Sequence, residues 1–210
     1  MNIQADQLDV DATYKLLTGI VVPRPVAWIT TLSDSGVVNL APFSAFTFVS
    51  SQPPMIGVSL GRKAGVRKDT ADHMWNSREF VVNIGDQTHL EKIHESSGEY
   101  PPEVSEVDLL GLAIAPSLHI KVPRLADVPV SMECTLSQVI EFGNIGTEFF
   151  VGEVLAYHIR DGLYRNGKVE TRELNPVCRL GGPNYATLGE VITLRRIDLT
   201  PRGATRAVTR

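Results

Sequence analysis

Two long segments, residues 131–142 and 148–160, constrain the fold most, because both are predicted to be strands and they lie close together in the chain. The residues between them include Gly143-Asn144-Ile145-Gly146, and glycine and asparagine accept the positive φ of a tight turn. We therefore expect a β-hairpin here. A hairpin makes its two strands antiparallel neighbours, so the sheet around it is expected to be antiparallel.

The rest of the chain predicts more strands and only short helices. Strands are expected at 24–32, 37–40, 45–49, 55–60, 79–84 and 118–122, and helices at 9–19, 69–77 and 86–95. Residues 96–116 form an irregular excursion with one short helix near 107–112. Because strands and helices do not alternate regularly, a closed or nearly closed antiparallel barrel is favoured over a doubly wound sheet.

Length and composition suit one domain, which we assign to residues 1–199, followed by a basic tail at 200–210 with Arg202, Arg206 and Arg210. The net charge of −4 predicts no general attraction to nucleic acid or to an anionic membrane. No apolar run reaches the ~18 residues of a membrane-spanning helix, and no signal peptide is recognised, so we expect a cytoplasmic protein. Cys134 and Cys178 have no metal-binding spacing, and no metal site is expected.

Four basic residues lie directly before a predicted helix start: Arg62, Lys63, Arg67 and Lys68. The exposed N–H groups and the dipole at a helix start attract anions, and a lysine adds a full charge. This pattern favours a phosphate site, although the glycine spacing of a Walker loop is missing. A solvated basic loop with an ordinary helix cap is the alternative.

Small polar residues lie at the ends of strands in the preceding segment: Thr30, Thr31, Asn39 and Ser44. Their side chains could bind the polar edge of a heterocycle, or they could serve only as turn and capping residues. Trp28 is expected to be a core residue rather than a stacking platform.

The stretch Gly57-Val-Ser59-Leu-Gly61 matches the nucleophile-elbow pattern G-x-S-x-G of serine hydrolases. Such an enzyme would use Ser59 with His158 as base and Asp127 as its orienting acid. The elbow requires a helix straight after the serine, but the next predicted helix starts at Asp69. A hydrolase is therefore kept only as a remote alternative.

Among the histidines, His73 and His89 are expected on the surfaces of helices. His158 lies near the end of a long predicted strand, where it could contact a substrate or a nicotinamide, or be an ordinary hydrogen-bonded histidine. No G-x-G-x-x-G follows a strand, so a nicotinamide would bind without a Rossmann fold. Later in the chain, residues 175–185 combine glycines with Arg179 and Tyr185, and suit either a binding turn or a glycine-rich cap of the sheet.

The ordered set of motifs resembles the flavin reductase-like family of FMN-binding split barrels, in a flavoredoxin-like branch. The motifs are Pro23-Arg24-Pro25-Val-Ala-Trp-Ile-Thr30-Thr31, Asn39-Leu-Ala-Pro42-Phe43-Ser44, Pro53-Pro54-Met, Lys68-Asp69-Thr70, Glu79-Phe-Val-Val-Asn83, Gly152-Glu153-Val and Arg179-Leu-Gly-Gly-x-x-Tyr185. The resemblance covers about residues 12–190.

The resemblance implies a mainly β fold with short helices, as a six-stranded antiparallel Greek-key split barrel. It also implies a homodimer with FMN near its interface, and NADH or NADPH as the hydride donor. Carried over to this sequence, residues Thr30, Thr31, Asn39, Ala41, Pro42, Phe43 and Ser44 would line the isoalloxazine. The phosphate would be held by Ser59, Leu60, Gly61, Arg62, Lys68, Asp69 and Thr70. His158, Arg179 and Tyr185 would lie near the flavin or across the interface, and no residue is assigned as a catalytic acid or base.

Three functions stay open at this point. The first is a reductase that passes hydride from NAD(P)H to FMN, with an oxygenase or another redox protein as a partner. The second is a flavoredoxin-like electron carrier with tightly bound FMN. The third is a binding protein of this fold that has lost redox turnover.

Overall fold

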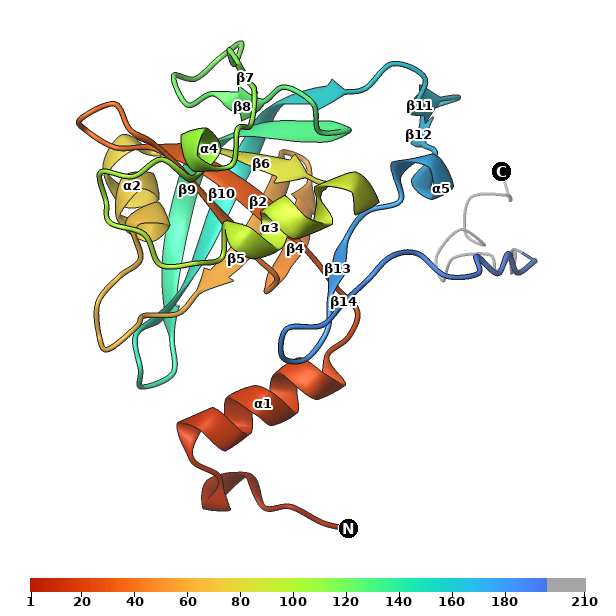
Figure 1. The fold of residues 1–210 in the computed structure, drawn as a ribbon. Helices are drawn as coiled ribbons and strands as arrows, with labels where there is room; N and C mark the ends of the chain where they lie inside the picture. Colours follow the sequence, from red (N-terminus) through yellow and green to blue (C-terminus); the bar gives the residue numbers. More distant parts are fainter. Residues whose placement is uncertain (196–210) are drawn as a thin grey trace, which may run out of the picture.

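One antiparallel sheet forms the centre of the computed structural model, which describes residues 1–195 (Figure 1). Its strand order is β3-β2-β6-β9-β10-β5-β4. The strands are β2 (Ala27–Leu32), β3 (Val38–Phe43), β4 (Phe46–Ser51), β5 (Pro54–Leu60), β6 (Glu79–Ile84), β9 (Val130–Phe142) and β10 (Thr147–Ile159).

Short strands and helices surround this sheet. The small sheets join β1 (Arg24–Pro25) to β13 (Cys178–Arg179) and β14 (Tyr185–Ala186), β7 (Ile114–Ala115) to β8 (Arg124–Leu125), and β11 (Tyr164–Arg165) to β12 (Lys168–Val169). The helices are α1 (Val10–Ile20), α2 (Asp69–Ser77), α3 (Leu90–Glu95), α4 (Glu106–Leu109) and α5 (Thr171–Leu174), with 3-10 turns at Ala5–Gln7 and Gln87–His89.

The mainly β, antiparallel architecture and the hairpin predicted at 143–146 are confirmed, since Phe142 pairs with Thr147 at the closed end of β9 and β10. The strand number and the closure differ from the expectation. The main sheet has seven strands instead of six, and within residues 1–195 its edge strands β3 and β4 do not pair with each other. The sheet is therefore open between β3 and β4. The basic tail expected at 200–210 lies outside the described residues.

The strand predicted at 118–122 is wrong, because that segment is a loop. Its backbone donors are used by carboxylates: Leu118 and His119 donate to Glu133, and Lys121 donates to Glu79. An apolar run whose N–H groups go to side chains cannot also form a strand ladder.

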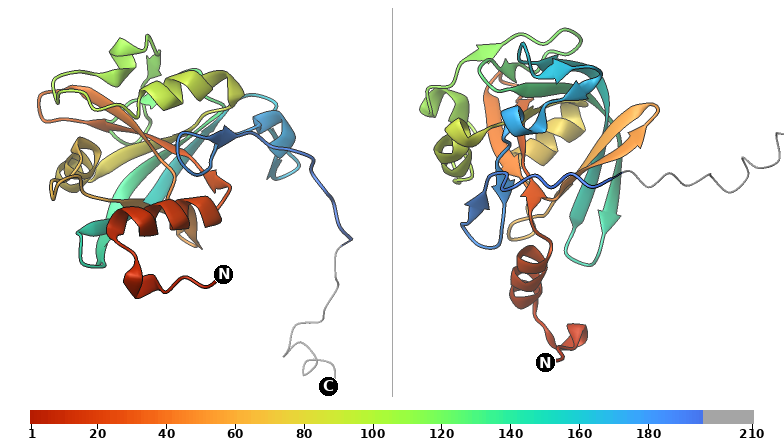
Figure 2. Two further views of the ribbon diagram at one scale, coloured as in Figure 1. Left: turned by 60° about the horizontal axis from the view of Figure 1, so that its bottom comes forward. Right: turned by 90° about the vertical axis from the view of Figure 1, so that its right-hand side faces the viewer.

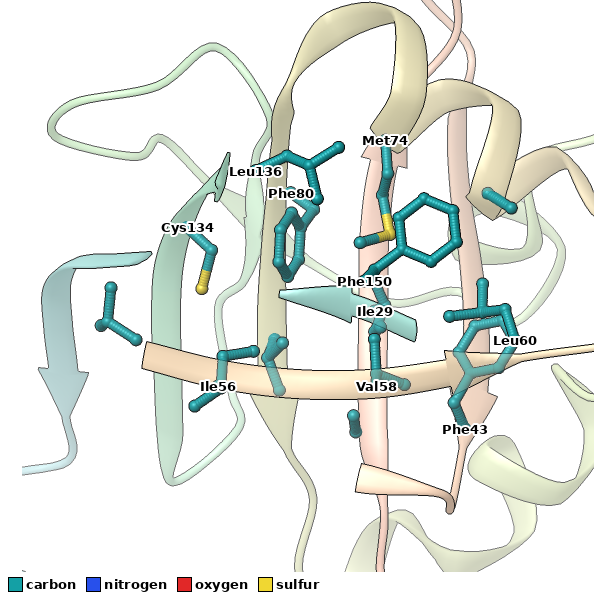
Figure 3. Close-up of a cluster of buried hydrophobic side chains, with 14 residues drawn as sticks. Ile29, Phe43, Ile56, Val58, Leu60, Met74, Phe80, Cys134, Leu136 and Phe150 are labelled. Carbon is teal, nitrogen blue, oxygen red and sulfur yellow. The ribbon is translucent and has the colours of Figure 1, made fainter. Parts of the chain in front are cut away.

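Two apolar clusters lie on opposite faces of the sheet. The inner cluster is shown in Figure 3 and contains Ile29, Phe80 and Phe150, with Met74 of α2 packed onto it. The outer cluster contains Trp28, which is fully buried as predicted and donates its indole N–H to Ser96 at 2.8 Å. Because successive residues of a strand point to opposite faces, the neighbours in β2 belong to different clusters.

Gly152 of β10 is expected to tolerate no side chain. A Cβ there would lie 2.4 Å from Cζ and 2.8 Å from Cε1 of Phe80, whose ring is fully buried. We expect Gly152→Ala to lower the free energy of unfolding by about 1–3 kcal/mol, as for other overpacked cores. Urea unfolding would measure this. The matched control is Gly189→Ala, where a Cβ meets nothing within 4 Å, and an equal loss in both variants would contradict the prediction.

Helix α1 projects away from the body of the protein (Figures 1 and 2). None of its residues is buried, and an apolar stripe is exposed on it at Val10 (61%), Tyr14 (66%) and Leu17 (56%). An isolated helix of 11 residues is marginal in water, so this stripe is expected to be covered by another molecule. Between residues 1 and 195, no helix is long and apolar enough to cross a membrane.

Candidate functional site

A buried polar cluster joins the start of α2 to strands β2 and β3. The Asn39 amide donates to Thr70 Oγ1 at 2.9 Å and to Thr31 Oγ1 at 3.3 Å. Thr31 Oγ1 also lies 3.0 Å from Nδ1 of His73. Three of the predicted site residues are thus brought together, although they are far apart in the sequence.

His73 belongs to this cluster, although the sequence placed it on a helix surface. Its ring is half-buried, and burial lowers the pKa of His73, opposed by the nearby charges of Asp69 and Asp72. The sequence contained one signal for this position. His73 follows Asp69 by four residues, so both lie on the same face of α2. His89 is also not a surface residue, since only 12% of its side chain is exposed and it pairs with Asp86.

Thr30 lies on the other face of the sheet from this cluster. Its hydroxyl donates to the carbonyl of Pro123 at 2.7 Å and accepts from the amide of Asn83 at 3.3 Å. The expectation that Thr30 and Thr31 line one cleft is therefore not met. The reason is the alternation of side chains along β2, which sends neighbouring residues to opposite faces.

Lys68 occupies the N-cap position of α2 and provides no side-chain cap. Its ammonium lies 5.5 Å from the ring centroid of Phe43, another predicted site residue. Burial lowers the pKa of Lys68, and the charge of Lys63 lowers it further. Among residues 1–195 it has no acidic partner within ion-pair distance. It is therefore a cation available to a bound anion.

The other three basic residues before α2 lie beside acidic side chains. Arg67 donates from Nε to Glu148 Oε2 at 2.8 Å, and also from Nη2 to Oε1 of the same carboxylate. Arg62 donates to the carbonyl of Gly146 at 3.2 Å and lies 3.8 Å from Glu148. Lys63 pairs with Glu99. The structure therefore separates Lys68 from the neighbours that the sequence grouped with it.

Along Ala41–Ser44, as along β2, successive side chains point to opposite faces of the sheet. Ala41 and Phe43 face the inner cluster, whereas Pro42 lies between them on the other side of the strand. Ser44 Oγ accepts a hydrogen bond from Arg24 Nε at 3.2 Å, and Arg24 also donates to the carbonyl of Leu180 at 2.9 Å. Arg24, which the sequence analysis did not choose as a site residue, thus links Ser44 to the 179–185 turn.

Arg179 and Tyr185 form a cluster of their own with His94. The Arg179 guanidinium donates to the Tyr185 hydroxyl and lies 4.5 Å from its ring, and His94 Nδ1 lies 3.2 Å from the same hydroxyl. Burial raises the pKa of Tyr185, against the lowering effect of the arginine. Figure 1 places β13 and β14 apart from α2.

Ser59 lies inside strand β5, where its N–H donates to the carbonyl of Ala45 at 2.8 Å. The strand continues to Leu60, which is core, and no helix starts before Asp69. The strand–turn–helix of a nucleophile elbow is absent here. The hydrolase alternative is therefore wrong. Gly61 lies in the exposed start of the loop to α2.

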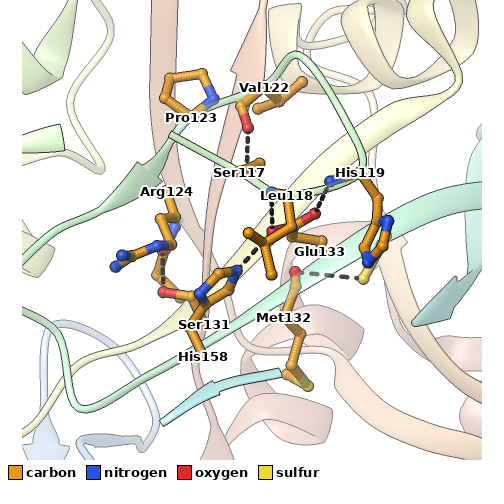
Figure 4. A network of polar contacts seen from close by, with 12 residues as sticks. Ser117, Leu118, His119, Val122, Pro123, Arg124, Ser131, Met132, Glu133 and His158 are labelled. Carbon is orange, nitrogen blue, oxygen red and sulfur yellow. Dashed lines mark hydrogen bonds and ion pairs between the residues drawn. The ribbon is translucent and has the colours of Figure 1, made fainter. Parts of the chain in front are cut away.

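His158 is part of a carboxylate network drawn in Figure 4. Its Nε2 lies 2.5 Å from Oε1 of Glu133, a side chain with no exposed surface. Leu118 N–H donates to the same carboxylate at 2.6 Å and His119 N–H donates at 2.8 Å. Burial raises the pKa of Glu133, but these three hydrogen bonds outweigh it, so the pKa lies below its ordinary value. His158 lies near the opposite end of β10 from Glu148.

The available donors suit a phosphorylated ligand more than a metal. The ammonium of Lys68, which has no acidic partner in residues 1–195, lies beside a helix start, and a cluster of hydroxyl and amide groups lies next to it. The part of the chain described here contains no group of three His, Cys, Asp or Glu side chains that could hold a metal ion.

The chain is similar to proteins of one known family. The model of the flavin reductase like domain matches residues 19–173. Nitrilotriacetate monooxygenase component B from Bacillus cereus has a structure similar to this one, with a TM-score of 0.90, 38% identity, and coverage of 92% of this chain and 98% of that chain. The 2-nitrobenzoate 2-nitroreductase of Pseudomonas fluorescens has a TM-score of 0.86 and 31% identity, and covers 96% of this chain and 98% of its own.

A third structure, from Shewanella frigidimarina, carries a split barrel domain. It has a TM-score of 0.83 at 19% identity, and covers 94% of this chain and 100% of its own. At this sequence identity, the similarity is evidence of a shared fold alone. It confirms the split-barrel architecture expected from the sequence.

Proposed function

The chain belongs to the flavin reductase-like family, and on that premise we propose that it is an FMN-dependent oxidoreductase that uses NADH or NADPH. The observation that supports the cofactor is Lys68, a basic residue at the start of α2 without an acidic partner in residues 1–195. A flavin phosphate is the group that such an ammonium would bind. A bound FMN would supply the chemistry, since its ring accepts a hydride.

The residues of the chain would bind and orient this cofactor. Lys68 and the N–H groups of Asp69 and Thr70 would hold the phosphate. Phe43, beside the Lys68 ammonium, would lie next to the ribityl chain or the ring. The Asn39 amide keeps Thr70 in place. No side chain is assigned as an acid or base.

An anaerobic FMN titration, followed by absorbance and flavin fluorescence, tests this proposal. Saturable binding near one FMN per chain, followed by oxidation of NADH or NADPH with excess FMN, is the expected result. Absence of FMN binding would contradict the proposed function and would not affect the assignment of the fold.

A flavoredoxin-like electron carrier is the second candidate. It would hold FMN tightly and would be reduced by a protein partner rather than by a nicotinamide. Fast nicotinamide oxidation that depends on added FMN favours the reductase, whereas reduction only by another protein favours the carrier. An oxygenase is the partner we propose for the reductase, because component B of a monooxygenase is among the similar structures. The cytoplasmic location stays a prediction.

We also propose that the protein is a homodimer in which the apolar stripe of α1 is covered by the second copy. Removal of the stripe with Tyr14→Glu and Leu17→Glu, at side chains that are 66% and 56% exposed, is expected to give monomers. Sedimentation at micromolar concentration would measure this. The control is Lys15→Glu on the same helix, outside the stripe, and a wild-type monomer would contradict the proposal.

A further inference from the structure

The Glu148 carboxylate lies beside two of the four basic residues that precede α2. It faces Leu60 across β10 and β5, so it stands where the chain leaves the sheet for the loop of residues 61–68. Arg62 from the start of that loop and Arg67 from its end both reach back to this carboxylate. Between them a tight turn, with φ of 47° at Ala64 and 78° at Gly65, closes the loop.

The pairs at Glu148 are shielded from solvent, unlike the pair of Lys63. Only 6% of the Glu148 side chain is exposed, with 25% of Arg67 and 31% of Arg62. The Lys63–Glu99 pair is 66% and 71% exposed, so water and salt screen it. The hydrogen bond to Glu148 is the largest effect on Arg67 and raises its pKa. Both guanidiniums therefore already have the Glu148 carboxylate as a partner.

We propose that Glu148 is a positioning residue that withholds Arg62 and Arg67 from the flavin phosphate and so limits the affinity of the site for FMN. This inference rests on the proposed function. Of the four basic residues, Lys68 is the one without an acidic partner in residues 1–195. A phosphate held by one side-chain cation is released more readily than one held by three. The arrangement suits a flavin that binds, is reduced and leaves, and hence a following reaction that consumes free reduced flavin.

The variant Glu148→Gln tests this, because it keeps the shape of the side chain and removes its charge. Affinities for FMN and for riboflavin, which lacks the phosphate, would be measured by fluorescence at low and high salt. We expect FMN to bind about five-fold tighter, with a steeper salt dependence, since the Arg62–Arg67 pair gains one unit of uncompensated positive charge near the phosphate. Riboflavin affinity should stay within about two-fold.

Two further variants serve as controls. Glu99→Gln makes the same formal change at the exposed pair and should alter FMN affinity by less than about two-fold. The double variant Glu148→Gln/Arg62→Gln has the net charge of the wild type, so its ratio of FMN to riboflavin affinity should return toward the wild-type ratio. Thermal unfolding of each variant shows whether the fold is kept.

A second measurement does not depend on the folding of Glu148→Gln. In Lys68→Ala, the difference between FMN and riboflavin affinity should no longer depend on ionic strength. A salt dependence that persists would show Arg62 or Arg67 acting on the phosphate and would overturn the inference. An unchanged affinity ratio in Glu148→Gln, or equal weakening of both flavins, would also overturn it. If the wild type binds FMN but these tests fail, the proposed function stands without this inference; if the wild type binds neither flavin, both fall.

Discussion

Replacement of Lys68 by alanine is expected to weaken FMN binding by about 10- to 150-fold. The estimate corresponds to about 1.5–3 kcal/mol, the range for a hydrogen bond that involves a charged group. The effect should be large because Lys68 has no acidic partner in residues 1–195, and its neighbours Arg62 and Arg67 are paired with Glu148. Fluorescence titration of purified protein would measure it.

Two comparisons make the result specific to the phosphate. Riboflavin should bind the Lys68→Ala variant as it binds the wild type, since it has no phosphate to lose a contact. Lys63→Ala removes a cation five residues earlier that is paired with Glu99 and exposed, and it should change FMN affinity by less than about two-fold. An unchanged dissociation constant for FMN in Lys68→Ala would remove this residue from the site.

Replacement of Glu133 by alanine is expected to lower the free energy of unfolding by about 3–5 kcal/mol. The carboxylate has no exposed surface and accepts from His158 and from the N–H groups of Leu118 and His119. Without it, the two backbone donors lose their acceptor and the loop above β9 loses its attachment. Chemical denaturation at neutral pH would measure the loss.

The effect of this carboxylate should also depend on pH. Because the pKa of Glu133 is lower in the folded protein than its ordinary value, its ionisation stabilises the fold above the ordinary glutamate range. That contribution is lost as the pH falls from this range through the folded pKa. The stability difference between wild type and Glu133→Gln should therefore shrink on acidification. A difference that is constant from neutral pH to strong acid would contradict it.

The matched control for both measurements is Glu79→Ala. Glu79 also holds the 118–122 loop, by accepting from the N–H of Lys121 at 2.8 Å, but this hydrogen bond is exposed to solvent. Its removal should lower the free energy of unfolding by less than about 1.5 kcal/mol. Equal losses at Glu79 and Glu133 would show that burial is not the cause.

The sequence alone was sufficient for features that depend on near neighbours in the chain. The hairpin at 143–146 agrees with the prediction, because a turn is made by residues a few positions apart. Helix α2 (Asp69–Ser77) ends where it was predicted to end, but its N-cap is Lys68, without a side-chain cap bond, and not Asp69 or Thr70. The position of Trp28 in the core was also predicted correctly, since a large apolar ring near the start of a strand seldom stays exposed. The same local patterns placed Lys68 at a helix start.

Only the tertiary structure decided which polar and charged residues remain available to bind a ligand. Glu148 lies 81 positions from Arg67 in the sequence, so no local pattern could show that Arg67 is paired and Lys68 is not. Likewise, Thr31 joins Asn39 and Thr70 while Thr30 turns to Pro123, because strand alternation and distant loops determine the neighbours of each hydroxyl. The physical reason is that ion pairs and buried hydrogen bonds depend on distance in space, which the chain sets only when its sheet has formed.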